Sequence, residues 1–215
     1  MVPYPSGDGA YWAADVGRSE NPHSIEILPD GNIAVAASTG SWVRVYTASQ
    51  GRGSTAYAEL ELPGAHGVVW DSTRELLWAS ADHEVVGLEI GGTPAVPTIT
   101  ERVRYPLPTS WGHDLTPIAG DPDHLWVATG SAVYLLDLET GEYATDYPGA
   151  ETVNVPGIKA VSTNPATGQL LTTRNELGNP CTWCTDTVRL HVPTDSRTLA
   201  GGEIYKARWW ADPAN

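Results

Sequence analysis

Residues 22–37 read PHSIEILPDGNIAVAA, and this stretch decides the fold of the chain. It holds a histidine, a short run of alternating apolar residues, a Pro-Asp-Gly-Asn turn and a second apolar run. Two such runs joined by turn-forming residues predict an antiparallel hairpin, because Gly, Asn and Asp accept the backbone angles of a tight turn.

The same arrangement returns along the chain. Residues 65–71 read AHGVVWD and precede LLWA, and residues 112–115 read GHDL and precede HLWVA. The histidines His23, His66 and His113 are spaced by 43 and 47 residues, and Lys159 stands a further 46 residues on, in the degraded copy GIKAV. Another 46 residues lead to Tyr205. Repeats therefore begin near residues 23, 66, 113, 159 and 205.

A period of about 40–50 residues with several short strands is typical of a β-propeller blade. The chain is predicted to be all-β, a single β-propeller domain over residues 1–215 with four complete four-stranded blades. The expected strands are residues 23–28, 32–37, 42–46 and 56–62; 66–71, 75–79, 85–90 and 99–105; 114–119, 124–129, 132–138 and 143–147; and 159–163, 169–173, 187–192 and 197–199.

Two terminal segments are left over. Residues 204–210 look like the innermost strand of a further blade, and residues 10–16 look like an outermost strand. A blade made from these two would lack its middle strands. Either the chain is an N-terminally shortened propeller, or a partner fills the gap, which would be self-association through the incomplete blade.

Composition excludes several classes of partner. The 12 Lys and Arg residues face 26 Asp and Glu residues, for a net charge of −14, so nucleic acid and anionic membrane surfaces are repelled. No stretch of 18 apolar residues predicts a membrane span, and residues 1–20 lack a secretory signal. An anionic substrate requires that Lys159, Lys206 and Arg208 form a local positive pocket.

The repeated histidines are the first candidate site. The innermost strands of a propeller begin at one mouth of the channel, so His23, His66 and His113 are predicted neighbours. Three imidazoles could hold zinc, manganese or iron, or serve as acid and base. The alternative is that each histidine bonds a backbone carbonyl of the next blade as a structural repeat residue.

Residue types change in the later repeats. Lys159 and the run from Tyr205 to Arg208 replace the histidines, which favours an asymmetric, functional mouth. Lys159 and Tyr205 join the catalytic candidates. The candidate substrate-binding residues are Trp111, Asp114, Arg174, Lys206 and Arg208. Trp111 is also open to interpretation as a packing residue, and Arg174 as an exposed loop charge.

Cys181 and Cys184 form a CxxC motif in a loop of the fourth repeat. A CxxC can be a redox pair, half of a zinc site or a local disulfide. No second CxxC completes a zinc site, so a disulfide that closes this loop is favoured. It implies an oxidising compartment.

Four runs together resemble a known family: NPHSIEILPDGN at residues 21–32, GHDL at 112–115, TDTVR at 185–189 and YKARWW at 205–210. They resemble an uncharacterised family of bacterial exported β-propeller proteins, a domain of unknown function. The resemblance covers nearly the whole chain and implies the fold, export to the cell exterior and a longer N-terminus in other members. It implies no activity, and the cysteine pair is not a general feature of the family.

Two functions from different classes follow. The first is a secreted enzyme, a lyase or hydrolase that acts on an extracellular saccharide or related ester, with or without a divalent metal. The second is a non-catalytic propeller that binds a carbohydrate or a protein. Both place a small molecule or saccharide among the expected ligands.

Overall fold

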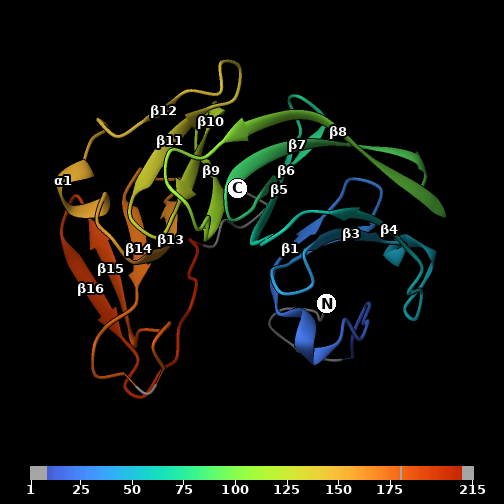
Figure 1. Cartoon of the computed structure of the whole chain (residues 1–215). Coiled ribbons are helices and arrows are strands. Elements are labelled where there is room, and N and C mark those ends of the chain that lie inside the picture. The colour runs from blue at the N-terminus through green and yellow to red at the C-terminus, as the bar shows by residue number, and fades with distance from the viewer. Residues whose placement is uncertain (1–8, 180, 210–215) are drawn as a thin grey trace. The chain divides into compact units, whose positions relative to one another are not determined.

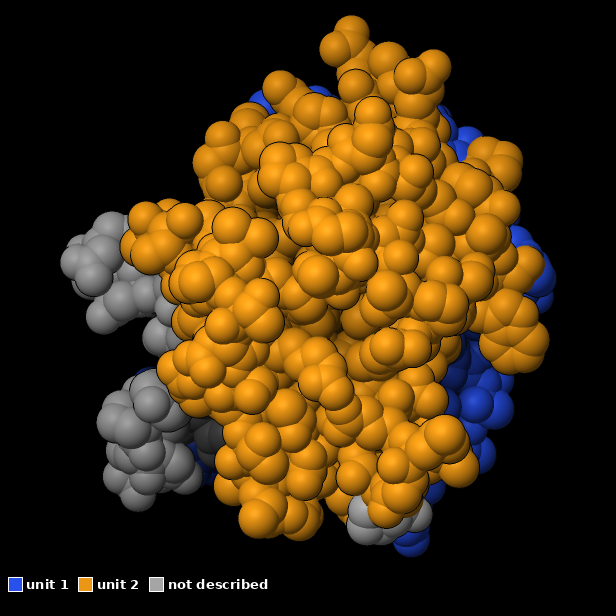
Figure 2. Space-filling model, turned by 90° about the vertical axis from the view of Figure 1, so that its left-hand side faces the viewer, with its two compact units in different colours: residues 1–105 blue, residues 106–215 orange. Residues whose placement is uncertain are grey.

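The computed structural model describes residues 9–179 and 181–209, and the chain divides into two compact units. Unit 1 is Met1–Tyr105 and unit 2 is Pro106–Asn215, coloured separately in Figure 2. Each unit holds two four-stranded antiparallel sheets whose strands follow one another in chain order. Among the described residues, no helix has the length and apolar composition needed to cross a bilayer.

Within residues 9–179 and 181–209 the sheets consist of sixteen strands, and Figure 1 labels most of them. Unit 1 contains β1 (Pro22–Ile27), β2 (Ile33–Ala37), β3 (Trp42–Tyr46), β4 (Tyr57–Glu61), β5 (Gly67–Asp71), β6 (Leu76–Ser80), β7 (Glu84–Thr93) and β8 (Val96–Pro106). Unit 2 contains β9 (Asp114–Ile118), β10 (Asp121–Ala128), β11 (Val133–Asp137), β12 (Tyr143–Ala144), β13 (Ile158–Thr163), β14 (Leu170–Arg174), β15 (Thr187–His191) and β16 (Asp195–Thr198). Short helices are η1 (Arg18–Glu20), η2 (Ala48–Gln50) and α1 (Ala150–Val153).

The first hairpin shows why the sequence folds in this way. Gly31 adopts φ 82°, which glycine tolerates without a steric penalty, and the Asp30 carboxylate accepts a hydrogen bond from the Asn32 amide at 3.0 Å. This turn sets the register that pairs Ile27 with Ile33. Each sheet repeats such an up-and-down meander, which is the β-propeller blade, so the predicted all-β propeller with four blades is confirmed.

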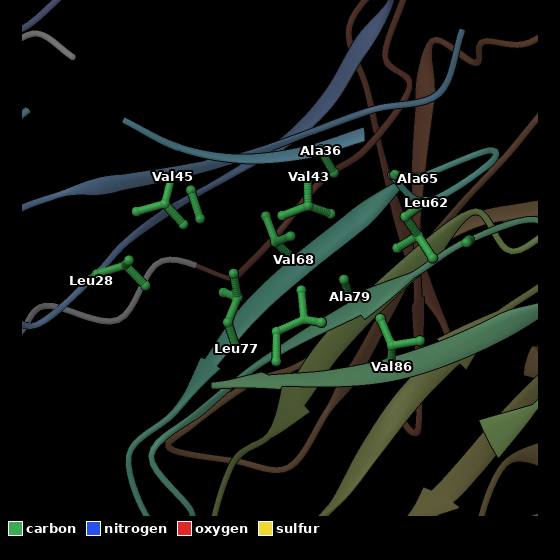
Figure 3. Packing of buried hydrophobic residues seen from close by; sticks show 13 residues of the cluster. Leu28, Ala36, Val43, Val45, Leu62, Ala65, Val68, Leu77, Ala79 and Val86 are labelled. Carbon is green, nitrogen blue, oxygen red and sulfur yellow. The ribbon is translucent and has the colours of Figure 1, made fainter. Parts of the chain in front are cut away.

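The core of unit 1 lies between its two sheets. Figure 3 shows Val43 and Val45 of β3 and Val68 of β5 in one cluster of buried side chains. Leu77 of β6 is fully buried in the same cluster. Small alanines at Ala34 and Ala36 allow the sheets to pack closely, since neither blade could bury its apolar face alone.

Unit 2 has its own core. Trp126 and Val133 of one sheet pack with Ile158 and Val161 of the other, and Val153 of α1 joins them. The Trp126 indole donates to the Thr163 hydroxyl at 2.8 Å, so its polar edge is satisfied within the cluster. This packing fixes the starts of β9 and β13, which carry the candidate site residues.

The expected terminal strands are wrong. Residues 10–16 form no strand; instead Trp12 is buried against Ile33 and Val35, and its indole donates to the Ser54 carbonyl at 2.7 Å. Residues 204–209 make a single bridge, between Ile204 and Thr185. After this bridge, the Tyr205 carbonyl and the Trp209 amide bond to the hydroxyls of Thr173 and Ser162, and the described part of the segment forms no strand. Trp210 of the expected strand lies outside the described residues.

Candidate functional site

His23 and His66 lie together in unit 1. Their rings stack with centroids 4.1 Å apart and planes inclined by 24°. His23 sits at a register irregularity of β1, and His66 directly precedes β5. The Nδ1 atom of His66 lies 2.7 Å from the Gly64 carbonyl oxygen, which can only accept, so Nδ1 carries the proton. The structural interpretation expects a carbonyl of the next blade, whereas Gly64 lies only two residues before His66 in the chain.

His113 and Lys159 form the corresponding pair in unit 2. His113 directly precedes β9, Lys159 is the second residue of β13, and their Nε2 and Nζ atoms are 2.8 Å apart. Burial lowers the pKa of Lys159. Two positive charges facing each other at this distance are unfavourable, so at least one of the two groups is uncharged. An uncharged amine or imidazole is a group that can act as a general base.

Asp114, the next residue, carries a second set of contacts. Its carboxylate is 1% exposed, and its Oδ1 atom accepts from Arg208 Nη2 at 2.5 Å and lies 3.3 Å from Lys206 Nζ. Burial alone would raise the pKa of Asp114, but the charges of Arg208 and Lys206 outweigh it and hold the pKa below its ordinary value. Burial lowers the pKa of Lys206 despite the carboxylate beside it.

The segment 204–209 brings these cations to Asp114. The Tyr205 carbonyl accepts from the Thr173 hydroxyl at 2.8 Å, and the Trp209 amide donates to the Ser162 hydroxyl at 3.2 Å. Burial, with the nearby Asp114 charge, raises the pKa of Tyr205, so its phenol stays protonated. We call His113, Asp114, Lys159, Tyr205, Lys206 and Arg208 the polar cluster of unit 2.

Trp111 lies two residues before His113 and is 66% exposed. Its φ is 72°, in the left-handed region that a bulky residue rarely adopts. Such backbone strain at an exposed aromatic residue is more typical of a ligand contact than of a packing role.

Arg174 is exposed at the end of β14 and lines a pocket of about 520 Å³ together with Arg189 and His191. His191 is buried, and its ring nitrogens lie 2.9 and 3.0 Å from the hydroxyls of Thr172 and Thr152. Burial and the charge of Arg189 lower its pKa. Arg174 thus borders this pocket, and it pairs with Ile158, the residue before Lys159, in the register of β13 and β14.

Cys181 and Cys184 are joined in a disulfide, with Cα atoms 5.6 Å apart. Between them, Trp183 makes an edge contact with Tyr205, with ring centroids 5.8 Å apart. Trp183 is not among the site residues predicted from the sequence. The sequence feature that could have identified Trp183 is its position between the two cysteines, because a loop closed by a disulfide restrains the aromatic side chain that it carries.

The residues described contain no group of three or more His, Cys, Asp and Glu side chains placed to hold a metal. The rings of His23 and His66 are stacked with their planes inclined by 24°, so their nitrogen lone pairs lie in nearly parallel planes. Lys159 Nζ lies at the Nε2 atom of His113. The histidine metal site therefore stays a prediction.

Solved structures with a similar fold include several enzymes. The chain aligns with the iodide structure of Trichoderma reesei carbohydrate-active enzyme family AA12 at 16% identity and a TM-score of 0.58, over 91% of this chain and 55% of that one. It aligns with Kuenenia stuttgartiensis hydrazine synthase at 15% identity and a TM-score of 0.56, over 89% and 50%. A catalytically inactive histidine-to-alanine variant of Staphylococcus aureus virginiamycin B lyase, with Quinupristin, aligns at 15% identity and a TM-score of 0.52, over 88% and 60%.

These similarities show the fold alone, and the chain spans about half the length of the first of these structures. No curated protein matches the sequence. Residues 11–214 match the family of unknown function DUF6528, which covers nearly the whole chain. This protein is therefore a member of the DUF6528 family.

Proposed function

We propose that this protein is an enzyme that uses acid–base chemistry on an anionic saccharide or related ester, as a lyase or hydrolase. The observation that carries the proposal is the 2.8 Å pairing of His113 with Lys159 next to Asp114 and its two cations. In the polar cluster of unit 2, the cations Lys206 and Arg208 face the single carboxylate of Asp114, in a chain of net charge −14. This local excess of positive charge suits a carboxylate-bearing substrate.

An elimination assigns a role to each group. The His113–Lys159 pair takes the proton from the carbon next to the substrate carboxylate, and Arg208 stabilises the charge that develops on that carboxylate. The carbon–oxygen bond to the leaving group breaks as the carbon–carbon double bond forms. Tyr205 donates its proton to the leaving oxygen. The pKa of Tyr205 is raised, but the departing alkoxide is a stronger base than the tyrosinate, so this proton transfer is favourable. Hydrolysis would use the same base on a water molecule.

The structural comparisons support this proposal at the level of the scaffold. One similar fold is described as a carbohydrate-active enzyme, and another is a lyase described as catalytically inactive when a histidine is replaced by alanine. Propellers therefore carry both carbohydrate chemistry and histidine-dependent elimination. The argument for this chain depends on its own residues.

His23 and His66 have a separate place in the proposal. They would act as further acid and base groups, or as ligands of zinc, manganese or iron together with His113, after their rings turn out of the present stack. No step above depends on them. Elemental analysis of the purified protein, with His66→Ala as the comparison, tests the metal: a stoichiometric ion that the variant loses supports it, and a metal-free active protein contradicts it.

The proposed setting is extracellular. The Cys181–Cys184 disulfide supports an oxidising compartment. Self-association through the incomplete blade of the terminal segments is part of the proposal. Sedimentation velocity on the wild type tests this point: a monomeric wild type contradicts it.

A second candidate function is a non-catalytic module that binds a saccharide or a protein loop. The observation that favours it is Trp111, whose indole is 66% exposed on a strained backbone. The two functions differ in what happens to the bound ligand. Binding that leaves every ligand chemically intact would support the module.

The experiment that separates them is a turnover assay on oligosaccharides of uronic acids and their methyl esters. Product carrying a double bond conjugated to a carboxylate reports elimination, and new reducing ends without it report hydrolysis. We expect His113→Ala and Lys159→Met to lower the rate by about 10²–10⁴-fold, as removal of a general base does. His83→Ala, at an exposed position in unit 1, is the matched control. The absence of turnover on every substrate, or full activity of His113→Ala, contradicts the proposal.

A further inference from the structure

The loop that carries the disulfide is held more firmly than an exposed connection requires. Cys184 is buried, and its carbonyl accepts from the Asn179 side chain at 3.1 Å and from the Glu176 amide at 3.3 Å. The Asn175 side chain donates to the Thr182 carbonyl at 3.3 Å. The disulfide between Cys181 and Cys184 closes the same turn. These contacts order the backbone on both sides of Trp183.

The ordered loop does not bury the Trp183 side chain. Its side chain is 46% exposed, although an indole is among the most favourable groups to bury. One edge contacts the half-buried Tyr205 ring at an interplanar angle of 81°, and Lys206 Nζ lies 5.6 Å from the centroid of the same ring. Trp183 therefore borders the polar cluster of unit 2 and leaves ring surface open to solvent.

An open aromatic face beside charged groups has a defined ligand chemistry. A sugar ring stacks its C–H face on an indole, while its hydroxyl and carboxylate groups bond to polar side chains at the edge of the platform. Lys206 and Arg208 supply such cations, and each already lies at Asp114. A neutral sugar would use the platform but not the cations, and a simple carboxylate would use the cations but not the platform.

We propose that Trp183 is the stacking platform for one sugar ring of an acidic oligosaccharide, and that the Cys181–Cys184 disulfide positions it. This inference rests on the proposed function and names its substrate class: a uronate-containing oligosaccharide whose carboxylate meets Lys206 and Arg208. Reduction of the disulfide frees the loop and weakens binding without altering the polar cluster.

The test is isothermal titration calorimetry with trigalacturonate, and with maltotriose as the neutral comparison. We expect wild type to prefer the acidic trisaccharide and Trp183→Ala to bind it roughly 10-fold more weakly, the size of one aromatic contact. Trp183→Phe keeps most of the affinity, because it keeps a stacking face. The double variant Cys181→Ser, Cys184→Ser falls between wild type and Trp183→Ala.

The control is Tyr11→Ala, which removes an aromatic side chain of 65% exposure in unit 1. Thermal unfolding of every variant confirms that the fold is kept, since the loop closes on only a few residues. Equal affinities of wild type and Trp183→Ala, equal affinities for the two trisaccharides, or no binding of trigalacturonate would each overturn the inference. If Trp183→Ala loses binding but the wild type turns over no substrate, only the proposed function is contradicted. If the wild type turns over substrate but Trp183→Ala binds trigalacturonate as tightly as the wild type does, only this inference is contradicted.

Discussion

Replacing Asp114 by asparagine isolates the buried charge at the centre of the polar cluster. The substitution keeps the shape of the side chain and removes its charge. Lys206, 13% exposed, and Arg208, 38% exposed, then face each other without a carboxylate between them. We expect a clear loss of stability, because an uncompensated buried cation is costly.

The magnitude follows from the burial of the partners. Breaking a buried ion pair costs about 3–5 kcal/mol. The contribution of Arg208 is reduced by solvent screening, so the lower end, about 3 kcal/mol, is expected at neutral pH. For a domain of this size, each kcal/mol lowers Tm by about 2–4 °C, which gives a decrease of about 6–12 °C.

The effect of Asp114 on stability also depends on pH, in a direction that follows from its shifted pKa. The folded-state pKa of Asp114 is depressed, so its stabilisation is present above the unfolded pKa of about 3.9 and is lost as pH falls through the lower folded pKa. The difference in free energy of unfolding between wild type and Asp114→Asn should therefore persist at neutral pH and close only in acid.

Urea denaturation monitored by tryptophan fluorescence measures these differences. Adding Lys206→Met to Asp114→Asn should recover much of the loss, because it removes the buried cation. Asp195→Asn, at an exposed ion pair with Arg197, is the control and should leave the transition unchanged. A loss below about 1 kcal/mol in Asp114→Asn at neutral pH would refute the argument that this carboxylate compensates buried charge.

Two further predictions concern unit 1, and both are measured by urea denaturation. Leu77→Ala should lower the free energy of unfolding by about 2–5 kcal/mol, because Leu77 is fully buried between the two sheets; the exposed Leu199→Ala should not, and equal effects would contradict the assigned core. Burial raises the pKa of Glu26 to about 7. The contribution of the protonated Glu26 to the free energy of unfolding is therefore fully present below the unfolded pKa of about 4.5 and is lost as pH rises through 7. Glu26→Gln should therefore be more stable than wild type at pH 8 but not at pH 4, and the exposed Glu61→Gln should show no such crossover.

The strands were predictable because their signals are local. Each hairpin is specified by its own alternation of apolar and polar residues and by its turn residues, such as Asp30 and Gly31. Because the pattern recurs along the chain, each copy supports the assignment of the others. The prediction failed at residues 204–209. Their apolar pattern suits a strand, but a strand also needs a neighbouring backbone, and here the hydroxyls of Thr173 and Ser162 take that place. The predicted disulfide and the candidate histidines came from spacing alone, which cannot give a contact distance.

The sequence by itself determined the period, the blade strands and the residue types at the start of each repeat. Only the tertiary structure decided their partners. It brings Lys159 to His113 across 46 residues and Arg208 to Asp114 across 94, and it stacks His23 on His66. The physical reason is that strand formation depends on neighbours along the chain, whereas a charge pair depends on distance in space. That distance is set only when the buried faces of the sheets pack.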